Sequence, residues 1–116
     1  MTAQQIRFVK DSLPAALSAG AAFNLNPVAI LSQAAFESGW GTSNLAVKHN
    51  NFFGLTAYGA SNAYWHGGKT TVKASSYPLN FRRYDTRENS FLDFARLIRN
   101  NYRSAWQVSN NPQAYA

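Results

Sequence analysis

Apolar residues recur at helical spacing over the first part of the chain. In residues 2–13 three apolar side chains follow this spacing, and the pair Thr2 and Gln5 matches the capping box that opens many helices. Pro14 lacks the backbone N–H that a helix interior uses, so it predicts an end or a restart of the helix at this point. A second, turn-rich helical piece is expected through residue 22.

Residues 27–37 form the most apolar segment of the chain. Asn26 is a favoured N-cap, Pro27 suits the first helical position, and Gly39 is typical of a helix C-terminus. Apolar side chains surround the predicted helix on all sides. This pattern predicts a central, buried helix that ends close to Glu37.

The character of the chain changes between residues 50 and 76, where Gly, Ser, Thr, Asn and aromatic residues dominate. Residues 70–73 and 79–84 each predict a short strand, and together they predict a small β-hairpin lobe. A last helix begins near residues 85–88. Its predicted buried stripe has five members at helical spacing: Phe91, Phe94, Ala95, Ile98 and Tyr102. The whole pattern predicts one α+β domain, mostly α, over residues 1–116.

The composition narrows the partners that this domain can have. Its net charge of +6 suits nucleic acid, anionic membranes or anionic wall polymers. The chain has no Lys/Arg run typical of nucleic-acid binding and no stretch of the ~20 apolar residues that cross a membrane. We therefore expect a wall polymer as partner, without nucleic acid or membrane insertion, and a monomer with no visible signal peptide. With no cysteine and two histidines, we expect no metal site and no cofactor.

Glu37 is the residue that points most directly to catalysis. It is the only charged side chain between Asp11 and Lys48, and it closes the most apolar segment. Desolvation in such a segment penalises the charged form of a carboxyl group and favours a proton donor near neutral pH. The alternative is a structural carboxylate that pairs with Lys48 or caps a neighbouring helix.

Two sequence blocks resemble a known family. Residues 33–46 read Gln-Ala-Ala-Phe-Glu-Ser-Gly-Trp-Gly-Thr-Ser-Asn-Leu-Ala, and residues 50–55 read Asn-Asn-Phe-Phe-Gly-Leu. Together with later blocks at residues 65–67, 81–85 and 90–98, they resemble the glucosaminidase family of peptidoglycan hydrolases, glycoside hydrolase family 73. This family includes the wall-cutting domain of the flagellar rod protein. The resemblance covers roughly residues 5–110.

The resemblance implies a lysozyme-like helical domain with a small β-hairpin lobe flanking a substrate cleft. It implies a glucosaminidase-like catalytic domain that cuts the β-1,4 bond after N-acetylglucosamine in peptidoglycan glycan strands. Glu37 falls on the catalytic acid of the family. Such an enzyme works at the cell wall, in the periplasm or outside the cell.

The chain departs from the family pattern in two places. The family usually carries a second acid on a longer hairpin, whereas residues 67–80 contain no acid. The family also continues past the end of this chain into a segment with an active-site tyrosine. This predicts a trimmed C-terminus, and Tyr115 cannot be equated with that tyrosine.

The remaining acids leave the mechanism open. Asp85 and Glu88 are expected to cap a helix, and Asp93 is expected at a solvated helix position. Glycoside hydrolysis normally uses two carboxyl groups, but the 2-acetamido group of the substrate can replace one of them. Alternatively, the 6-hydroxyl of N-acetylmuramic acid attacks, as in lytic transglycosylases. A third hypothesis is a non-catalytic wall-binding module.

Five side chains are candidates for contacting the glycan: Asn51, Phe53, Tyr58, Tyr64 and Trp65. Asn51 and Phe53 are expected on the floor beside Glu37. The three aromatic residues of the Gly-rich lobe present flat rings that can stack on sugar faces, with core packing as the alternative.

Overall fold

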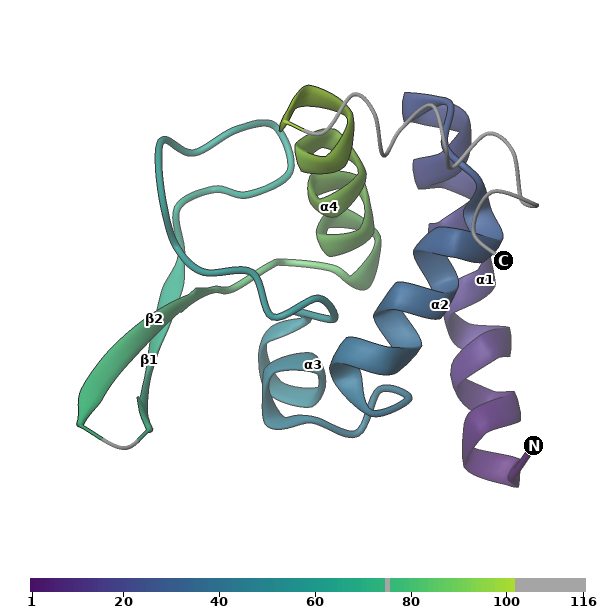
Figure 1. Ribbon diagram of the computed structural model, residues 1–116, viewed down its shortest axis with the longest axis horizontal. Helices are drawn as coiled ribbons and strands as arrows, with labels where there is room; N and C mark the ends of the chain where they lie inside the picture. Colours follow the sequence, from purple (N-terminus) through teal and green to yellow (C-terminus); the bar gives the residue numbers. More distant parts are fainter. Residues whose placement is uncertain (75, 102–116) are drawn as a thin grey trace.

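The computed structural model describes residues 1–74 and 76–101. Within these residues, four helices and a two-stranded antiparallel sheet follow one another (Figure 1): α1 (Ala3–Phe23), α2 (Pro27–Ser38), α3 (Asn44–His49), β1 (Lys69–Ala74), β2 (Tyr77–Arg82) and α4 (Arg87–Asn101). This order confirms the mostly helical α+β class. Tyr102 and Tyr115 lie outside the described residues.

Helix α1 is continuous, so the break expected at Pro14 is wrong. The capping box is confirmed, because the Thr2 side chain accepts from the backbone of Gln5 while the Gln5 side chain accepts from the Thr2 N–H. Proline removes one backbone donor from a helix. Here small buried residues after Pro14, among them Ala15 and Ala19, let α1 pack closely on α2 and α4, and this packing holds the helix together.

Helix α2 begins and ends where the sequence predicts. The Asn26 side chain accepts from the N–H of Val28 at 2.8 Å, and Gly39 ends the helix in a left-handed conformation with φ of 58°. The expectation that α2 is buried on all sides is wrong, since Val28 and Phe36 are exposed. The helix buries one side against the core and leaves the other open.

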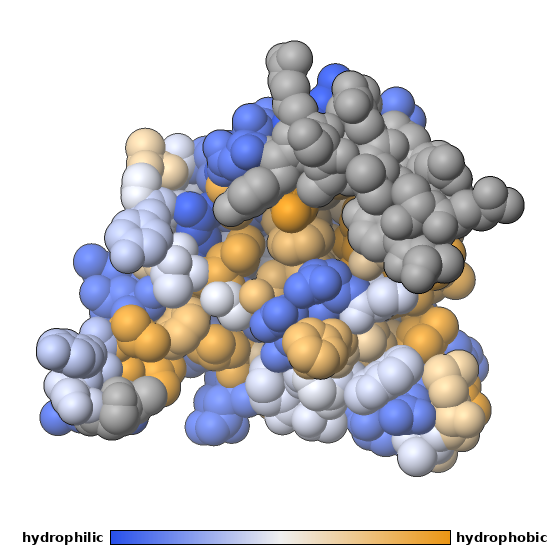
Figure 2. Space-filling model, in the orientation of Figure 1, coloured by the Kyte–Doolittle hydropathy of each residue, from blue (hydrophilic) through white to orange (hydrophobic). Residues whose placement is uncertain are grey.

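The β-hairpin is confirmed and extends away from the helices (Figure 1). Its register runs from the pair Lys69 and Arg82 to the pair Ala74 and Tyr77, so the second strand lies two residues earlier than predicted. A single bridge between Thr56 and Phe81 attaches the preceding loop to the base of the hairpin. Figure 2 shows apolar surface beside the hairpin at lower left.

Aromatic rings make up the centre of the core. Phe91 is fully buried and meets Phe53 edge to face, with ring centroids 4.9 Å apart. Phe53 also stacks on Phe94 at 4.1 Å, and Phe52 packs against Phe8 and Phe91.

Within the described part of the chain, no helix has the length and apolar character needed to span a membrane.

Candidate active site

Glu37 lies in the last turn of α2 and is exposed. The burial expected from its apolar segment is therefore wrong. Ile30 and Ala34 share its face of the helix at helical spacing and are both buried, so the core ends within one turn of Glu37. Its carboxylate accepts a hydrogen bond from the Gln33 amide at 3.1 Å. Within residues 1–74 and 76–101 it makes no ion pair, so pairing with Lys48 is absent.

The turn after Glu37 holds the end of α2 in one position. The buried Ser38 hydroxyl donates to the carbonyl of Ala34 at 2.6 Å and accepts from the N–H of Gly41 at 2.8 Å. Gly39, Trp40 and Gly41 all have positive φ, which glycine adopts without strain. The Trp40 N–H donates to the carbonyl of Ala35 at 2.8 Å. The Glu-Ser-Gly-Trp-Gly motif is thus a rigid turn that presents Glu37 at the edge of the core.

Asn51 and Phe53 are buried, and their contacts are with the protein itself. The Asn51 amide donates to the carbonyls of Leu55 and Arg82 and accepts from the N–H of Leu55, with distances of 2.9–3.1 Å. These three bonds use most of its hydrogen-bonding capacity. Asn51 therefore ties the loop to the base of the hairpin, while Phe53 is part of the aromatic core.

The three aromatic candidates of the Gly-rich lobe differ in their exposure. Tyr58 is 76% exposed, and Tyr64 is half-buried against Phe23. Trp65 is only 3% exposed: its indole N–H donates to the carbonyl of Gly68, and the Arg82 guanidinium lies 4.2 Å from its ring centroid. Tyr58 and Tyr64 thus keep accessible ring surface, whereas the Trp65 ring is covered.

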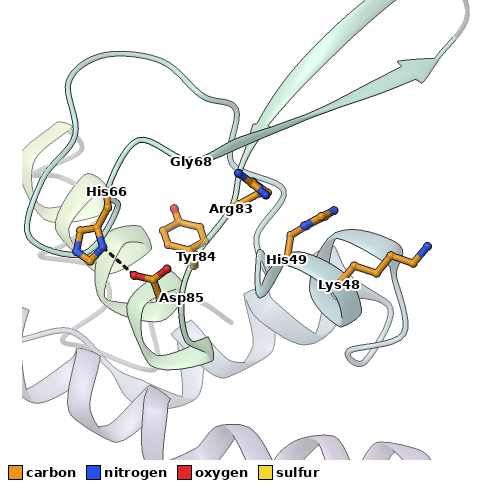
Figure 3. A pocket seen from close by; sticks show the side chains of 7 residues that line it. All are labelled: Lys48, His49, His66, Gly68, Arg83, Tyr84 and Asp85. Carbon is orange, nitrogen blue, oxygen red and sulfur yellow. Dashed lines mark hydrogen bonds and ion pairs between the residues drawn. The ribbon is translucent and has the colours of Figure 1, made fainter.

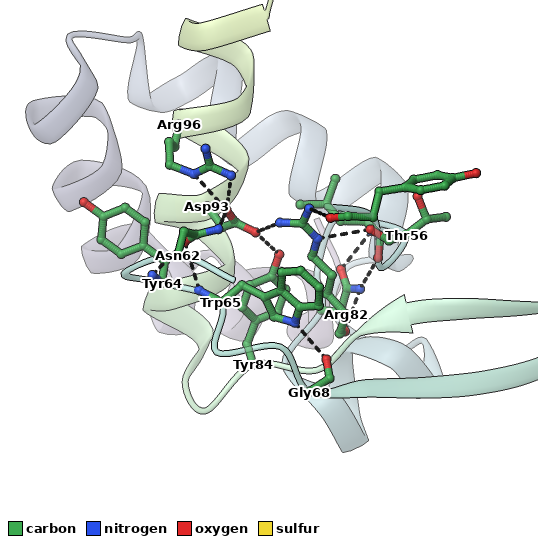
Figure 4. Close-up of polar contacts among 12 residues, drawn as sticks. Thr56, Asn62, Tyr64, Trp65, Gly68, Arg82, Tyr84, Asp93 and Arg96 are labelled. Atoms are coloured by element: carbon green, nitrogen blue, oxygen red, sulfur yellow. Dashed lines mark hydrogen bonds and ion pairs between the residues drawn. The ribbon is translucent and has the colours of Figure 1, made fainter. Parts of the chain in front are cut away.

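Asp93 is the centre of a buried polar network, so its expected solvated position is wrong (Figure 4). It is 0% exposed. Four side chains donate to its carboxylate: Arg82 at 2.6 Å, Tyr84 at 2.5 Å, Asn62 at 3.1 Å and Arg96 at 3.2 Å. Burial, followed by the hydrogen bond to Asp93, raises the pKa of Tyr84 well above its ordinary value. The network joins α4 to β2 and to the loop before the hairpin.

Sequence reasoning missed Asp93 because this residue faces away from the apolar stripe of α4. The segment that contains Tyr58 and Asn62 packs over this side of the helix: Asn62 donates to the carboxylate, and the Tyr58 carbonyl accepts from Arg82, another of its donors. The spacing of residues within α4 does not indicate that another segment packs over this side of the helix. Arg82 and Tyr84 could have indicated it, because a guanidinium and a phenol next to a buried strand end need a buried acceptor, which Asp93 supplies.

The other acids have structural surroundings of their own. Asp85 does not cap α4, because its carboxylate pairs with His66 at 2.8 Å. The cap is the Thr86 hydroxyl, which accepts from the N–H of Asn89 at 3.1 Å. Glu88 lies in the first turn of α4, where the helix dipole stabilises a negative charge. Among the residues that the structure describes, no group of three or more possible metal ligands comes together.

A family model and known proteins agree on the class of this domain. The model of the glucosaminidase family, described as mannosyl-glycoprotein endo-beta-N-acetylglucosaminidase, matches residues 13–116. The chain therefore belongs to the glucosaminidase family of glycoside hydrolases. It is 30% identical over 121 residues to the peptidoglycan hydrolase FlgJ of Vibrio parahaemolyticus. That alignment covers 93% of this chain and 38% of FlgJ, so the chain spans less than half of this relative.

Solved structures show the same fold. The catalytic domain of the autolysin Auto from Listeria monocytogenes is 27% identical, with a TM-score of 0.72 over 96% of this chain and 69% of that one. The glycoside hydrolase domain of FlgJ from Salmonella typhimurium is 24% identical, with a TM-score of 0.74 over 97% of this chain and 77% of that one. The family model confirms the family, and these structures confirm the lysozyme-like fold that the sequence blocks predicted.

Proposed function

We propose that this chain cleaves the β-1,4 bond after N-acetylglucosamine in peptidoglycan, with Glu37 as general acid. The observation that carries the proposal is the position of Glu37, exposed at the end of a helix that a rigid turn holds in place. A general acid must reach the leaving oxygen of a bound sugar from a fixed position. Substrate and location, at the wall in the periplasm or outside the cell, follow from the peptidoglycan hydrolases that the chain resembles.

The mechanism that fits one acid is substrate-assisted. Neither β1 nor β2 contains an acidic residue, so the hairpin supplies no second carboxylate. In this route the acetamido oxygen of N-acetylglucosamine attacks the anomeric carbon while Glu37 protonates the departing oxygen, which breaks the glycosidic bond. The Glu37 carboxylate then removes a proton from the water that opens the cyclic intermediate. One residue thus acts first as acid and then as base.

The absence of an acid on the hairpin also suits two other hypotheses. In a lytic transglycosylase the 6-hydroxyl of N-acetylmuramic acid takes the place of water and gives a 1,6-anhydro product. A wall-binding module would hold the glycan without cutting it. The products separate the three: reducing N-acetylglucosamine ends, 1,6-anhydro-muramic ends, or intact strands.

Two of the five candidate contacts are suited to the sugar itself. Tyr58 and Tyr64 keep accessible ring surface, and we assign them the stacking contacts. Asn51, Phe53 and Trp65 are buried, and we assign them the support of the loop that carries the two tyrosines.

The decisive experiment is Glu37→Gln, with mass spectrometry of the muropeptides released from purified peptidoglycan. The substitution keeps the shape of the side chain and removes the proton donor, so turnover should fall at least ~100-fold. Glu88→Gln, on an exposed carboxylate of α4, is the matched control and should keep most of the activity. Circular dichroism should show both variants folded. A loss below about tenfold in Glu37→Gln would place the chemistry elsewhere.

A further inference from the structure

A cavity of about 360 Å³ lies at the root of the hairpin, beside the end of α3. Gly68 directly precedes β1 and Arg83 directly follows β2, so both strands leave the body of the domain at this cavity. Figure 3 shows Lys48, His49 and Arg83 along one side of it and the pair His66 and Asp85 on the other. None of these residues takes part in the proposed cleavage.

Backbone hydrogen bonds fix the walls of this cavity. The Arg83 N–H donates to the carbonyl of Gly68 at 2.8 Å, and the Tyr84 N–H donates to the carbonyl of His49 at 2.9 Å. The Asn50 side chain donates to the carbonyl of Tyr84 at 3.2 Å. Three segments far apart in the sequence are therefore joined in one frame. A frame of this kind lets a ligand bind without first ordering the backbone.

Two basic side chains of the cavity have no partner among the described residues. In the part of the chain that the structure describes, neither Lys48 nor Arg83 forms an ion pair or a side-chain hydrogen bond. The one carboxylate, Asp85, is engaged by His66 at 2.8 Å. The other ring nitrogen of His66 lies 3.2 Å from the carbonyl of Ala63, so both nitrogens of the ring have partners within the protein.

Arg82 and Arg83 are adjacent in the sequence but differ in their surroundings. Arg82 is buried and donates to Asp93 and to the carbonyls of Thr56 and Tyr58. Arg83 follows it in the chain, is exposed, and keeps all its side-chain donors. Arg82 serves the fold, and Arg83 is left available to a ligand.

We propose that this cavity binds an anionic group of the wall polymer, a carboxylate or a phosphate, while the glycan is held at Glu37. The proposal rests on the proposed function, because it supplies a second contact with the same substrate. The guanidinium of Arg83 offers paired donors that match the oxygens of either group, and Lys48 adds a point charge. Peptide stems carry carboxylates on the glycan strand itself, and phosphate belongs to the accessory polymers of some walls.

The test measures binding in the Glu37→Gln background, so that turnover plays no part. The double variant Lys48→Gln and Arg83→Gln is compared with Arg7→Gln and Lys10→Gln, which removes the same charge from the exposed surface of α1. Each protein is co-sedimented with three materials: peptidoglycan stripped of phosphate polymers, the same material with its peptide stems removed by an amidase, and wall that keeps its phosphate polymers.

We expect the cavity variant to bind stem-bearing peptidoglycan about tenfold more weakly, as the loss of charge-assisted hydrogen bonds predicts. On stem-free glycan it should match the α1 control. A loss confined to the phosphate-bearing wall supports the same site with phosphate as its ligand. The proposal is overturned if the cavity variant binds every material as the control does. It is also overturned if removing the peptide stems leaves the excess loss of the cavity variant over the control unchanged and that excess is not confined to the phosphate-bearing wall.

The proposed cleavage is judged separately, with Glu37 intact. If the wild-type chain cuts none of the three materials, the proposed function fails while the binding comparison still decides the cavity. If it cuts them and the cavity variant binds like the control, the cleavage stands and the cavity proposal fails.

Discussion

Replacing Asp93 by asparagine should destabilise this domain severely. The carboxylate is fully buried and accepts hydrogen bonds from Arg82, Tyr84, Asn62 and Arg96. Asparagine keeps the size but leaves the buried guanidinium of Arg82 without its negative partner. Removing one member of a buried ion pair costs about 3–5 kcal/mol. At about 4 °C per kcal/mol for a domain of this size, the melting temperature should fall by roughly 12–20 °C.

Thermal and urea unfolding, followed by circular dichroism, measure this effect. Asp85→Asn is the matched control, because its carboxylate also contacts a basic side chain, His66, but is 70% exposed. An exposed pair contributes at most about 1 kcal/mol, so the control should remain close to wild type. Should Asp93→Asn fail to fold, Tyr84→Phe removes one donor and should cost about 0.5–3 kcal/mol. If Asp93→Asn is no less stable than Asp85→Asn, the network does not hold the hairpin lobe to α4.

Three further predictions follow from other parts of the domain. The folded-state pKa of Tyr84 is raised, so this residue contributes stability that is complete below about pH 10 and is lost as the pH rises further. Above that pH the free energy of unfolding of the wild type should fall by up to about 1.4 kcal/mol per pH unit more than that of Tyr84→Phe. Urea unfolding at a series of alkaline pH values measures both, and parallel curves would contradict the prediction. In Gly41→Ala, at φ of 79°, the new Cβ would lie 2.8 Å from the ring of Phe8. Calorimetry should show a loss of stability about 1–3 kcal/mol larger than that of the control Gly59→Ala, whose new Cβ meets no atom within 4 Å. Asp85→Asn should keep most of the activity on peptidoglycan if the substrate supplies the nucleophile; a loss as complete as that of Glu37→Gln would show that a second carboxylate is essential.

Local features of this fold were predictable from the sequence. The capping box at Thr2, the N-cap at Asn26 and the left-handed end at Gly39 each depend on residues within a few positions of one another. The hairpin followed from two short strands separated by a turn. The family resemblance followed from the blocks at residues 33–46 and 50–55 together with the later blocks.

Burial was decided by the tertiary structure. The apolar neighbours of Glu37 predicted a buried carboxylate, but the core ends one turn before it. Asp93 read as a solvated position, but a loop from an earlier part of the chain covers it. Trp65 read as a ring that could face a sugar, but Arg82 covers it. A helix cap is set by the chain near it, whereas the burial of a side chain depends on which distant segment packs over it, and the periodicity of one element carries no information about that segment.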